Sequence, residues 1–243
     1  MALNSLGFIG FGSFGQFIVP HLLPHFDLYV YDKRDISSDA KRIGVRTCTL
    51  DEALSKEIVL FGVPVQYLEE LLIEVKDRIN PNALVLDVSS VKIKPIDLIK
   101  KYLPDSVDIV GLHPLFGPQS GKYGIEGLNL VVCYVRTRHT NWIHNFFANE
   151  LKLNVLERTP ELHDRQMAYV QALTHFIGRS INSMDIPDVE QKTPAYQSLL
   201  DIKRNLGQDS FDLFLTIENE NPYAKAVREQ FIAELSKLNG LLR

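Results

Sequence analysis

A glycine-rich loop directly after a short apolar segment is the feature that most constrains the fold. Residues 6–9 are apolar, residues 10–15 read G-F-G-S-F-G, and helix-like sequence follows as far as His25. In such a loop the first glycine permits a tight turn, the second lets the backbone approach a pyrophosphate, and the third lets a helix pack closely on a strand. The free amides at the start of that helix favour negative charge. The pattern therefore predicts a dinucleotide-binding loop formed by Gly10, Phe11, Gly12, Ser13, Phe14 and Gly15.

An acidic residue follows at the position expected for binding a ribose. A second apolar run, residues 28–31, ends at Asp32, which lies 17 residues after Gly15 (32 − 15 = 17). A spacing of about 20 residues is usual for an acid that accepts hydrogen bonds from the 2′-hydroxyl of NAD and repels the 2′-phosphate of NADP. Lys33 and Arg34 come next and offer an alternative, because they could hold that phosphate. We expect NAD, with NADP as the alternative cofactor.

Strand-like and helix-like segments alternate through the first 157 residues. Strands are predicted over residues 57–63, 83–88, 107–112, 128–135 and 154–156, and helices over 65–79, 94–102 and 140–151. This alternation predicts an α/β fold with a Rossmann-type, doubly wound parallel sheet. Val63 and Pro64 end one strand at the edge where such sheets bind ligands, so we assign them to the cofactor site. We predict an NAD(P)-binding domain over residues 1–157.

The remaining residues, 158–243, have the pattern of an all-helical domain. Thr159 and Pro160 are a plausible helix start. An apolar stripe then recurs at steps of three and four residues, formed by Met167, Val170, Leu173, Ile177, Ile181 and Met184. A second face carries Gln171, His175, Arg179 and Asn182, and periodicity alone favours solvent exposure for it. Further helices are predicted over residues 195–206 and 209–218, with a break at Gly207, and from Asn221 onward.

Charge and composition argue against several classes of protein. The net charge of −4 provides no basic field for nucleic acid, and no apolar run reaches the ~18 residues of a membrane span. The two cysteines, Cys48 and Cys133, show no paired motif, and the first strand starts too early for a signal peptide. We therefore expect a cytoplasmic protein. The seven histidines form no ligand motif, so we expect no metal.

Two polar residues follow apolar, strand-like runs in the middle of the chain. Ser90 lies in the segment DVSSVK, and His113 lies in GLHPLFGPQSG. Ligands of open α/β sheets bind outside the carboxyl ends of the strands. Both residues are therefore expected at the ligand-binding edge of the sheet.

These motifs resemble the TyrA family, the prephenate and arogenate dehydrogenases of tyrosine biosynthesis. The resemblance is carried by GFIGFGSFG, DVSSVK, GLHPLFGPQSG, HDRQMAYVQALTHF and RNLGQD, and it covers nearly the whole chain. Within that family, the chain looks most similar to the dehydrogenase part of bifunctional chorismate mutase–prephenate dehydrogenases. The resemblance implies oxidative decarboxylation of prephenate to 4-hydroxyphenylpyruvate, with hydride transfer to NAD. Arogenate, which would give tyrosine, is an alternative substrate.

The resemblance also implies roles for single residues. His113 matches the catalytic histidine, and Ser90 matches a serine that bonds the substrate hydroxyl or positions that histidine. Arg204 matches the substrate-binding arginine, with Lys203 as a weaker substitute, because guanidinium geometry suits carboxylates. His175 and Gln119 are expected to line the substrate pocket, although some family members carry an acid in place of Gln119. The family further implies a homodimer formed by the helical domain.

Three alternatives compete with this interpretation. The β-hydroxyacid dehydrogenases share the layout but use a lysine on the first helix of the second domain, and residues 161–184 contain none. A paralogue acting on 4-amino-4-deoxyprephenate differs by one ring substituent, which the sequence barely separates. A non-catalytic, cofactor-binding regulator is disfavoured because Ser90, His113 and Arg204 are all present.

Overall fold

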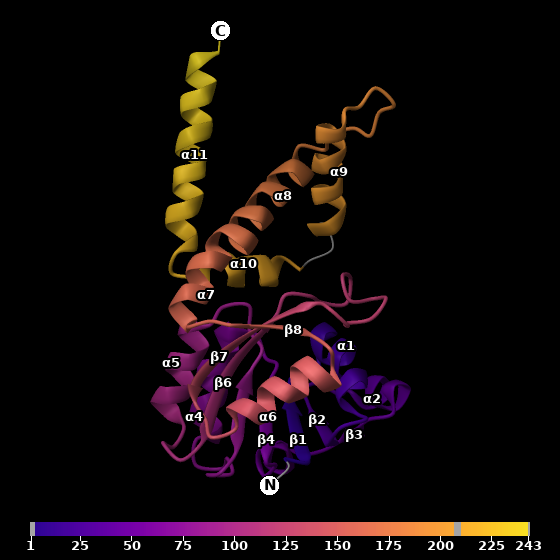
Figure 1. Ribbon diagram of the computed structural model, residues 1–243, viewed down its shortest axis with the longest axis vertical. Helices are drawn as coiled ribbons and strands as arrows, with labels where there is room; N and C mark the ends of the chain where they lie inside the picture. Colours follow the sequence, from indigo (N-terminus) through magenta and orange to yellow (C-terminus); the bar gives the residue numbers. More distant parts are fainter. Residues whose placement is uncertain (1–2, 207–209, 243) are drawn as a thin grey trace. The chain divides into compact units, whose positions relative to one another are not determined.

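A computed structural model describes residues 3–206 and 210–242 and divides the chain into two units, Met1–Pro160 and Glu161–Arg243 (Figure 1). The predicted domain boundary after residue 157 lies three residues before this division (160 − 157 = 3). In the part of the chain so described, no helix is long and apolar enough to cross a membrane.

Within its described residues, the first unit contains one sheet of eight strands in the order β3-β2-β1-β4-β5-β6-β7-β8. The strands are β1 Ser5–Ile9, β2 Asp27–Tyr31, β3 Arg46–Thr47, β4 Ile58–Phe61, β5 Leu84–Asp87, β6 Asp108–Pro114, β7 Asn129–Arg136 and β8 Asn154–Glu157. The predicted α/β fold, a Rossmann-type sheet followed by helices, is confirmed. The sheet is only mostly parallel, however, because β7 runs antiparallel to β6. No helix lies between these two strands, and a parallel connection would need such a crossover.

Helices cover both faces of the sheet. One core packs α1 Ser13–Leu22, α2 Ser37–Ile43, α6 Thr140–Asn145 and the π-helix η1 Phe146–Glu150 against the sheet. The other packs α3 Leu50–Leu54, α4 Val65–Val75 and α5 Ile93–Tyr102 against the opposite face. Strand β4 shows why: Ile58 and Leu60 enter the first core, and Val59 and Phe61 enter the second. A strand buried on both faces is apolar throughout, as this one is.

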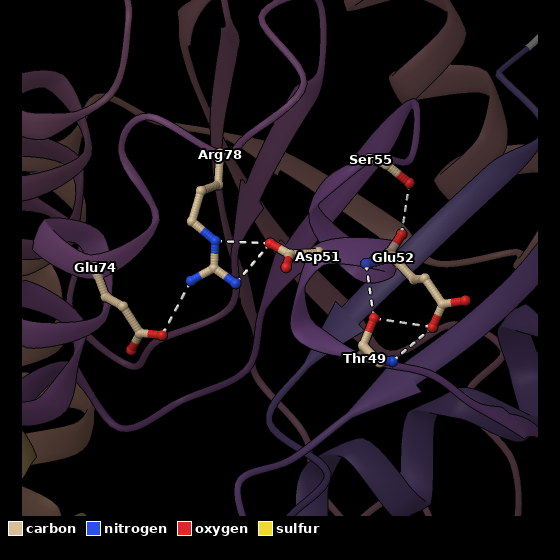
Figure 2. Close-up of polar contacts among 6 residues, drawn as sticks. All are labelled: Thr49, Asp51, Glu52, Ser55, Glu74 and Arg78. Carbon is tan, nitrogen blue, oxygen red and sulfur yellow. Dashed lines mark hydrogen bonds and ion pairs between the residues drawn. The ribbon is translucent and has the colours of Figure 1, made fainter.

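Three short elements between Asp32 and Glu57, namely α2, β3 and α3, were not predicted from the sequence. Helix α3 begins with a capping box. The Thr49 hydroxyl accepts from the Glu52 amide at 3.2 Å, and the Glu52 carboxylate accepts from the Thr49 amide at 2.8 Å (Figure 2). Such reciprocal bonds satisfy amides at the start of a helix that has no earlier turn. They stabilise a helix too short to show a periodic pattern.

Arg78 joins α3 to α4 across the surface of this layer. Its guanidinium donates to Asp51 at 2.7 Å and to Glu74 at 3.1 Å (Figure 2). All three side chains are at least a third exposed, so each ion pair contributes little to stability. The network fixes the orientation of α3 on the side of the sheet that carries α4.

The second unit is helical. Its elements are α7 Pro160–Met167, the π-helix η2 Ala168–Leu173, α8 Thr174–Ser183, α9 Pro194–Leu206, α10 Phe211–Glu220 and α11 Ala224–Leu241. Pro160 occupies the first helical position, as predicted. Helix α11 starts later than expected, because Asn221 precedes it and accepts a hydrogen bond from the Tyr223 amide at 2.9 Å. The predicted break at Gly207 and the predicted helix start at Asp209 lie outside the described residues.

The predicted faces of the helix over residues 160–183 were wrong in part, although Met167 of the apolar stripe is buried and Asn182 of the polar face is exposed, as predicted. Val170 and Met184, assigned to the apolar stripe, are 60% and 72% exposed. His175 and Gly178, on or beside the face expected to meet solvent, are buried instead. The π-helix η2 explains the difference, because it takes more residues per turn than an α-helix and so rotates all later residues to another side.

Candidate functional site

The first glycine of the loop makes a turn that only glycine accommodates well. Gly10 has φ +102° and donates its amide to the Tyr31 carbonyl at 2.8 Å. A Cβ on Gly10 would lie 2.7 Å from the backbone carbonyl of Gly62 and 3.0 Å from the Val63 side chain. The loop therefore passes directly against the end of β4, where Val63 is half-buried and Pro64 is exposed at the start of α4.

The second and third glycines leave room for a ligand and close the loop. A Cβ on Gly12 would meet nothing within 4 Å, whereas a Cβ on Gly15 would lie 2.8 Å from the Gly10 carbonyl. Gly12 caps α1 without any side-chain hydrogen bond. The first amides of α1 therefore face open space beside Gly12, where Ser13 is exposed and Phe14 half-buried. This cradle fits a pyrophosphate.

Asp32 lies at the end of β2 next to the loop. Its carboxylate accepts from the Phe11 amide at 2.8 Å, and from the backbone amide, Nε and Nη2 of Arg34 at 3.0 Å each. Despite desolvation by burial, the largest influence, the hydrogen bonds from Arg34 and Phe11 lower the pKa of Asp32. The acid predicted to bind the ribose is thus ionised, and it is engaged by Arg34.

Ser90 and His113 follow two neighbouring strands. Ser90 is half-buried in the turn between β5 and α5. His113 is 4% exposed and lies within β6, paired with Val131 of β7. The expectation that His113 would lie just past its strand was therefore wrong. The antiparallel pairing with β7 extends β6 by two residues beyond the predicted end at 112 (114 − 112 = 2).

A buried ion pair that we did not predict joins these two segments. Lys92 is fully buried, and its ammonium contacts the buried carboxylate of Asp87 and donates to the Leu112 carbonyl at 2.6 Å. Lys92 follows Ser90 by two positions, and Leu112 directly precedes His113. The pair therefore fixes the backbone of both segments relative to each other. The signal in the sequence was a lysine five residues after the acid that ends an apolar strand (92 − 87 = 5), in the segment DVSSVK.

Gln119 lies in the loop that connects β6 to β7, and its side chain is exposed at a turn. The loop is anchored on α1, because a Cβ on Gly121 would lie 2.4 Å from the Phe17 ring, which also packs against Phe116. Gln119 therefore stands on a loop that is anchored on α1 and begins after Pro114, the residue next to His113.

The second unit holds the remaining predicted residues. His175 is 7% exposed on α8. Arg204, near the end of α9, is exposed and pairs with Asp201 at 2.9 Å. Lys203 points elsewhere, donating to Asp185 at 3.2 Å and to the Ile186 carbonyl at 3.3 Å. Arg204 is thus held by an exposed ion pair on its own helix, whereas Lys203 bonds the loop that precedes α9.

The first unit thus brings the glycine loop, Asp32, Val63, Ser90 and His113 to one edge of one sheet. These residues follow β1, β2, β4 and β5 or lie at the end of β6, and the strands from β2 to β6 are parallel. The strand order reverses between β1 and β4, which is where open α/β sheets bind nucleotides. His175 and Arg204 belong to the helical unit.

Comparison with known families agrees with this architecture. Residues 23–137 match the model of the prephenate dehydrogenase nucleotide-binding domain, and residues 180–243 match a TYRAAT1-like C-terminal domain. A solved structure titled as prephenate dehydrogenase from Aquifex aeolicus superposes with a TM-score of 0.77 at 20% identity, covering 100% of this chain and 91% of that one. At that identity the likeness shows the fold.

Curated relatives extend the match over most of the chain. Arogenate dehydrogenase 2, chloroplastic, of Arabidopsis thaliana is 34% identical over 89% of this chain, and arogenate dehydrogenase 1, chloroplastic, is 30% identical over 98%. The chain spans only 63% and 39% of their lengths.

The expected closeness to bifunctional enzymes is not what these relatives show. The T-protein of Enterobacter agglomerans is 27% identical and matches only 49% of this chain, much less than the two arogenate dehydrogenases. The nucleotide-binding model, the helical C-terminal model and the extended matches nevertheless agree with one another. The nucleotide-binding part of the chain thus resembles that of prephenate dehydrogenases, and most of the chain is similar to part of the two arogenate dehydrogenases.

Proposed function

We propose that the chain catalyses the oxidative decarboxylation of prephenate or arogenate, coupled to hydride transfer to a nicotinamide cofactor. The observation that carries this proposal is the shared edge of the sheet. His113 and Ser90 stand at the same edge of the sheet as the glycine loop, and the buried Asp87–Lys92 pair fixes their backbones. The proposal is also supported by the names of the family model and the relatives.

The residues of the loop fit a dinucleotide. The open space beside Gly12 and the uncapped amides of α1 suit a pyrophosphate, and Asp32 lies where a ribose would be held. The Aquifex structure is titled as a complex with NAD⁺ and hydroxyphenyl propionate, which supports the same pair of ligand classes here. When bound, the cofactor would accept the hydride from the substrate ring.

His113 acts on the ring hydroxyl of the substrate in this proposal. The hydride leaves from the ring carbon that carries the hydroxyl. The hydroxyl then becomes carbonyl-like and acidic, and a neutral imidazole accepts a hydrogen bond from this hydroxyl. Histidine suits this role because its unperturbed pKa, about 6.5, leaves much of it neutral at pH 7. Ser90 bonds the same hydroxyl or orients His113. Carbon dioxide then leaves, and formation of the aromatic ring drives the reaction.

Arg204 holds a substrate carboxylate through its planar, two-pronged donors. Its partner Asp201 is exposed, so exchanging that surface ion pair for a substrate carboxylate costs little. We assign His175 and Gln119 to substrate binding as well. Gln119 is uncharged, which favours the keto acid side chain of prephenate over the ammonium group of arogenate. Arogenate remains the second candidate because two relatives carry that name.

A four-way assay tests the proposal. The purified chain is given prephenate or arogenate with NAD or NADP, and absorbance of the reduced nicotinamide is followed. Turnover with prephenate is the expected result, and turnover with arogenate alone would keep the reaction but reverse the choice of substrate. No turnover with any of the four pairs would contradict the proposal. The next tests would then be 4-amino-4-deoxyprephenate as the substrate and a regulatory role for the chain.

A further inference from the structure

Asp32 does not stand open to a ribose, because Arg34 occupies it. Two nitrogens of the Arg34 side chain, Nε and Nη2, bond the two different carboxylate oxygens at 3.0 Å each. The backbone amides of Arg34 and Phe11 add one bond to each oxygen. A carboxylate offers about four acceptor positions, so these donors fill it.

We infer that Arg34 sets the choice between NAD and NADP, and that the chain binds both cofactors rather than excluding the phosphorylated one. This inference rests on the nucleotide site of the proposed function. It goes further by making the specificity a property of the Asp32–Arg34 pair, where an acid alone would select NAD.

The geometry weakens the preference that Asp32 would otherwise create. The 2′-hydroxyl of NAD has to displace one donor before Asp32 can accept its hydrogen bond. The 2′-phosphate of NADP instead meets a carboxylate whose charge Arg34 already neutralises. A guanidinium has five N–H donors, of which the bonds to Asp32 use two, so the others remain for a phosphate. The Arg34 side chain is 63% exposed and can turn between these partners.

Neighbouring cations are placed differently. Arg42 is held by Asp39 at 3.0 Å and by Gln16 at 2.8 Å. The Lys33 ammonium lies 5.2 Å from the centre of the Tyr67 ring, toward α4. Arg34 is thus the side chain whose guanidinium is bonded to the ribose-binding acid. Arg42 carries the same charge eight positions later (42 − 34 = 8) and provides a matched control.

Equilibrium binding to the full chain tests the inference without any substrate. Dissociation constants for NAD, NADP and adenosine 2′,5′-bisphosphate are measured by titration calorimetry for the wild type and for Arg34→Ala, Arg42→Ala and Asp32→Asn. We expect Arg34→Ala to weaken NADP and the bisphosphate about 10- to 100-fold, the usual effect of losing a hydrogen bond to a charged group. The same change strengthens NAD by up to about fivefold, because it removes a surface competitor.

The other variants make the outcome specific. Asp32→Asn should shift the ratio of the two dissociation constants toward NADP, and Arg42→Ala should leave that ratio unchanged. An unchanged ratio in Arg34→Ala, an equal change in Arg42→Ala, or a wild type that binds NAD but not NADP would each overturn the inference. So would binding of none of the three nucleotides. A ratio that follows Arg34 in a protein without dehydrogenase turnover would uphold the inference while the proposed function fails.

Discussion

His113 is the residue whose environment most limits what it can do. Its side chain is buried in β6, and its backbone is fixed by the bond from Lys92 to the neighbouring Leu112 carbonyl. A buried imidazole in a strand cannot swing toward a distant partner, so it acts only on a group brought to that edge of the sheet. This constraint suits a residue that receives one hydrogen bond from one bound hydroxyl.

Replacing His113 with Asn should therefore reduce turnover and leave cofactor binding intact. Asparagine keeps a polar group of similar size but loses the basic nitrogen, and general-base help of this kind contributes about 10²–10⁴-fold. The measurement is kcat with the best substrate, beside the dissociation constant of the cofactor. His144→Asn is the control, because His144 is a half-buried residue of α6 paired with Glu157. Equal turnover in the wild type and His113→Asn would remove His113 from the mechanism.

Arg204 and Lys203 can be separated by their partners. Arg204→Gln should raise KM about 30-fold or more, since removing one member of a charge pair in a binding site costs at least about 2 kcal/mol. Lys203→Gln should instead leave KM near its original value, because Lys203 is bonded to Asp185 and Ile186. Steady-state kinetics of both variants show which of the two cations binds the substrate carboxylate. The reverse pattern would transfer the carboxylate-binding role to Lys203.

At the scale of elements, the Asp87–Lys92 pair connects the end of β5 with the end of β6. Both side chains are fully or almost fully buried, at 1% and 0% exposure. Breaking such a pair leaves an uncompensated charge in the interior. The pair therefore contributes to the alignment of Ser90 with His113 more clearly than to net stability.

Lys92→Met should lower the free energy of unfolding by about 3–5 kcal/mol. The variant leaves the buried Asp87 carboxylate without its ammonium partner. Urea unfolding of the wild type and of the variant measures the loss. The double variant Asp87→Leu/Lys92→Met should recover part of the loss, and a double variant no more stable than Lys92→Met would contradict this account.

The features that could be predicted from the sequence are those that depend on local residues, whereas the features that could not be predicted depend on distant contacts. The glycine loop and Asp32 could be predicted because a tight turn, a helix start and a strand end are local requirements. The burial of Lys92 and the buried face around His175 could not. The first depends on a contact with Leu112, 20 residues away (112 − 92 = 20), and the second on a π-helix that shifts the periodic pattern. Helix α3 was missed because its five residues are too few for a periodic pattern and its start depends on one capping box.

At the scale of the whole molecule, helix α11 carries an apolar stripe that its own unit covers only in part. Ala224 and Val227 are buried, whereas Leu235, Leu238 and Leu242 are exposed. Exposed apolar surface on this scale is typical of interaction sites. It agrees with the homodimer that the family resemblance implies, which we propose to form through this stripe.

Replacing both Leu235 and Leu238 with Glu should convert a dimer into a monomer, because two charges would be buried at the interface. Sedimentation velocity measures the mass of each species. Lys237→Ala, on the same turn but paired with Glu234, should leave the dimer intact. A wild type that sediments as a monomer at micromolar concentration, or a double variant that stays dimeric, would rule out this interface.

The strand order of the sheet predicts that the nucleotide site forms late during folding. Paired strands elsewhere in the sheet join residues no more than 27 positions apart, as in Ile109 with Arg136 (136 − 109 = 27), but β1 and β4 join Leu6 to Ile58 (58 − 6 = 52). Closing the longer loop has the larger entropic barrier, and distant pairings form slowly.

Pulsed hydrogen exchange during refolding should therefore show protection of the amides that join β6 to β7 before those that join β1 to β4, and the opposite order would contradict this sequence of events. The seam between β1 and β4 is also where Gly10 meets Gly62. The cofactor cradle is accordingly the last part of the sheet to assemble, so a newly synthesised chain gains its ligand only once both halves of the sheet have joined.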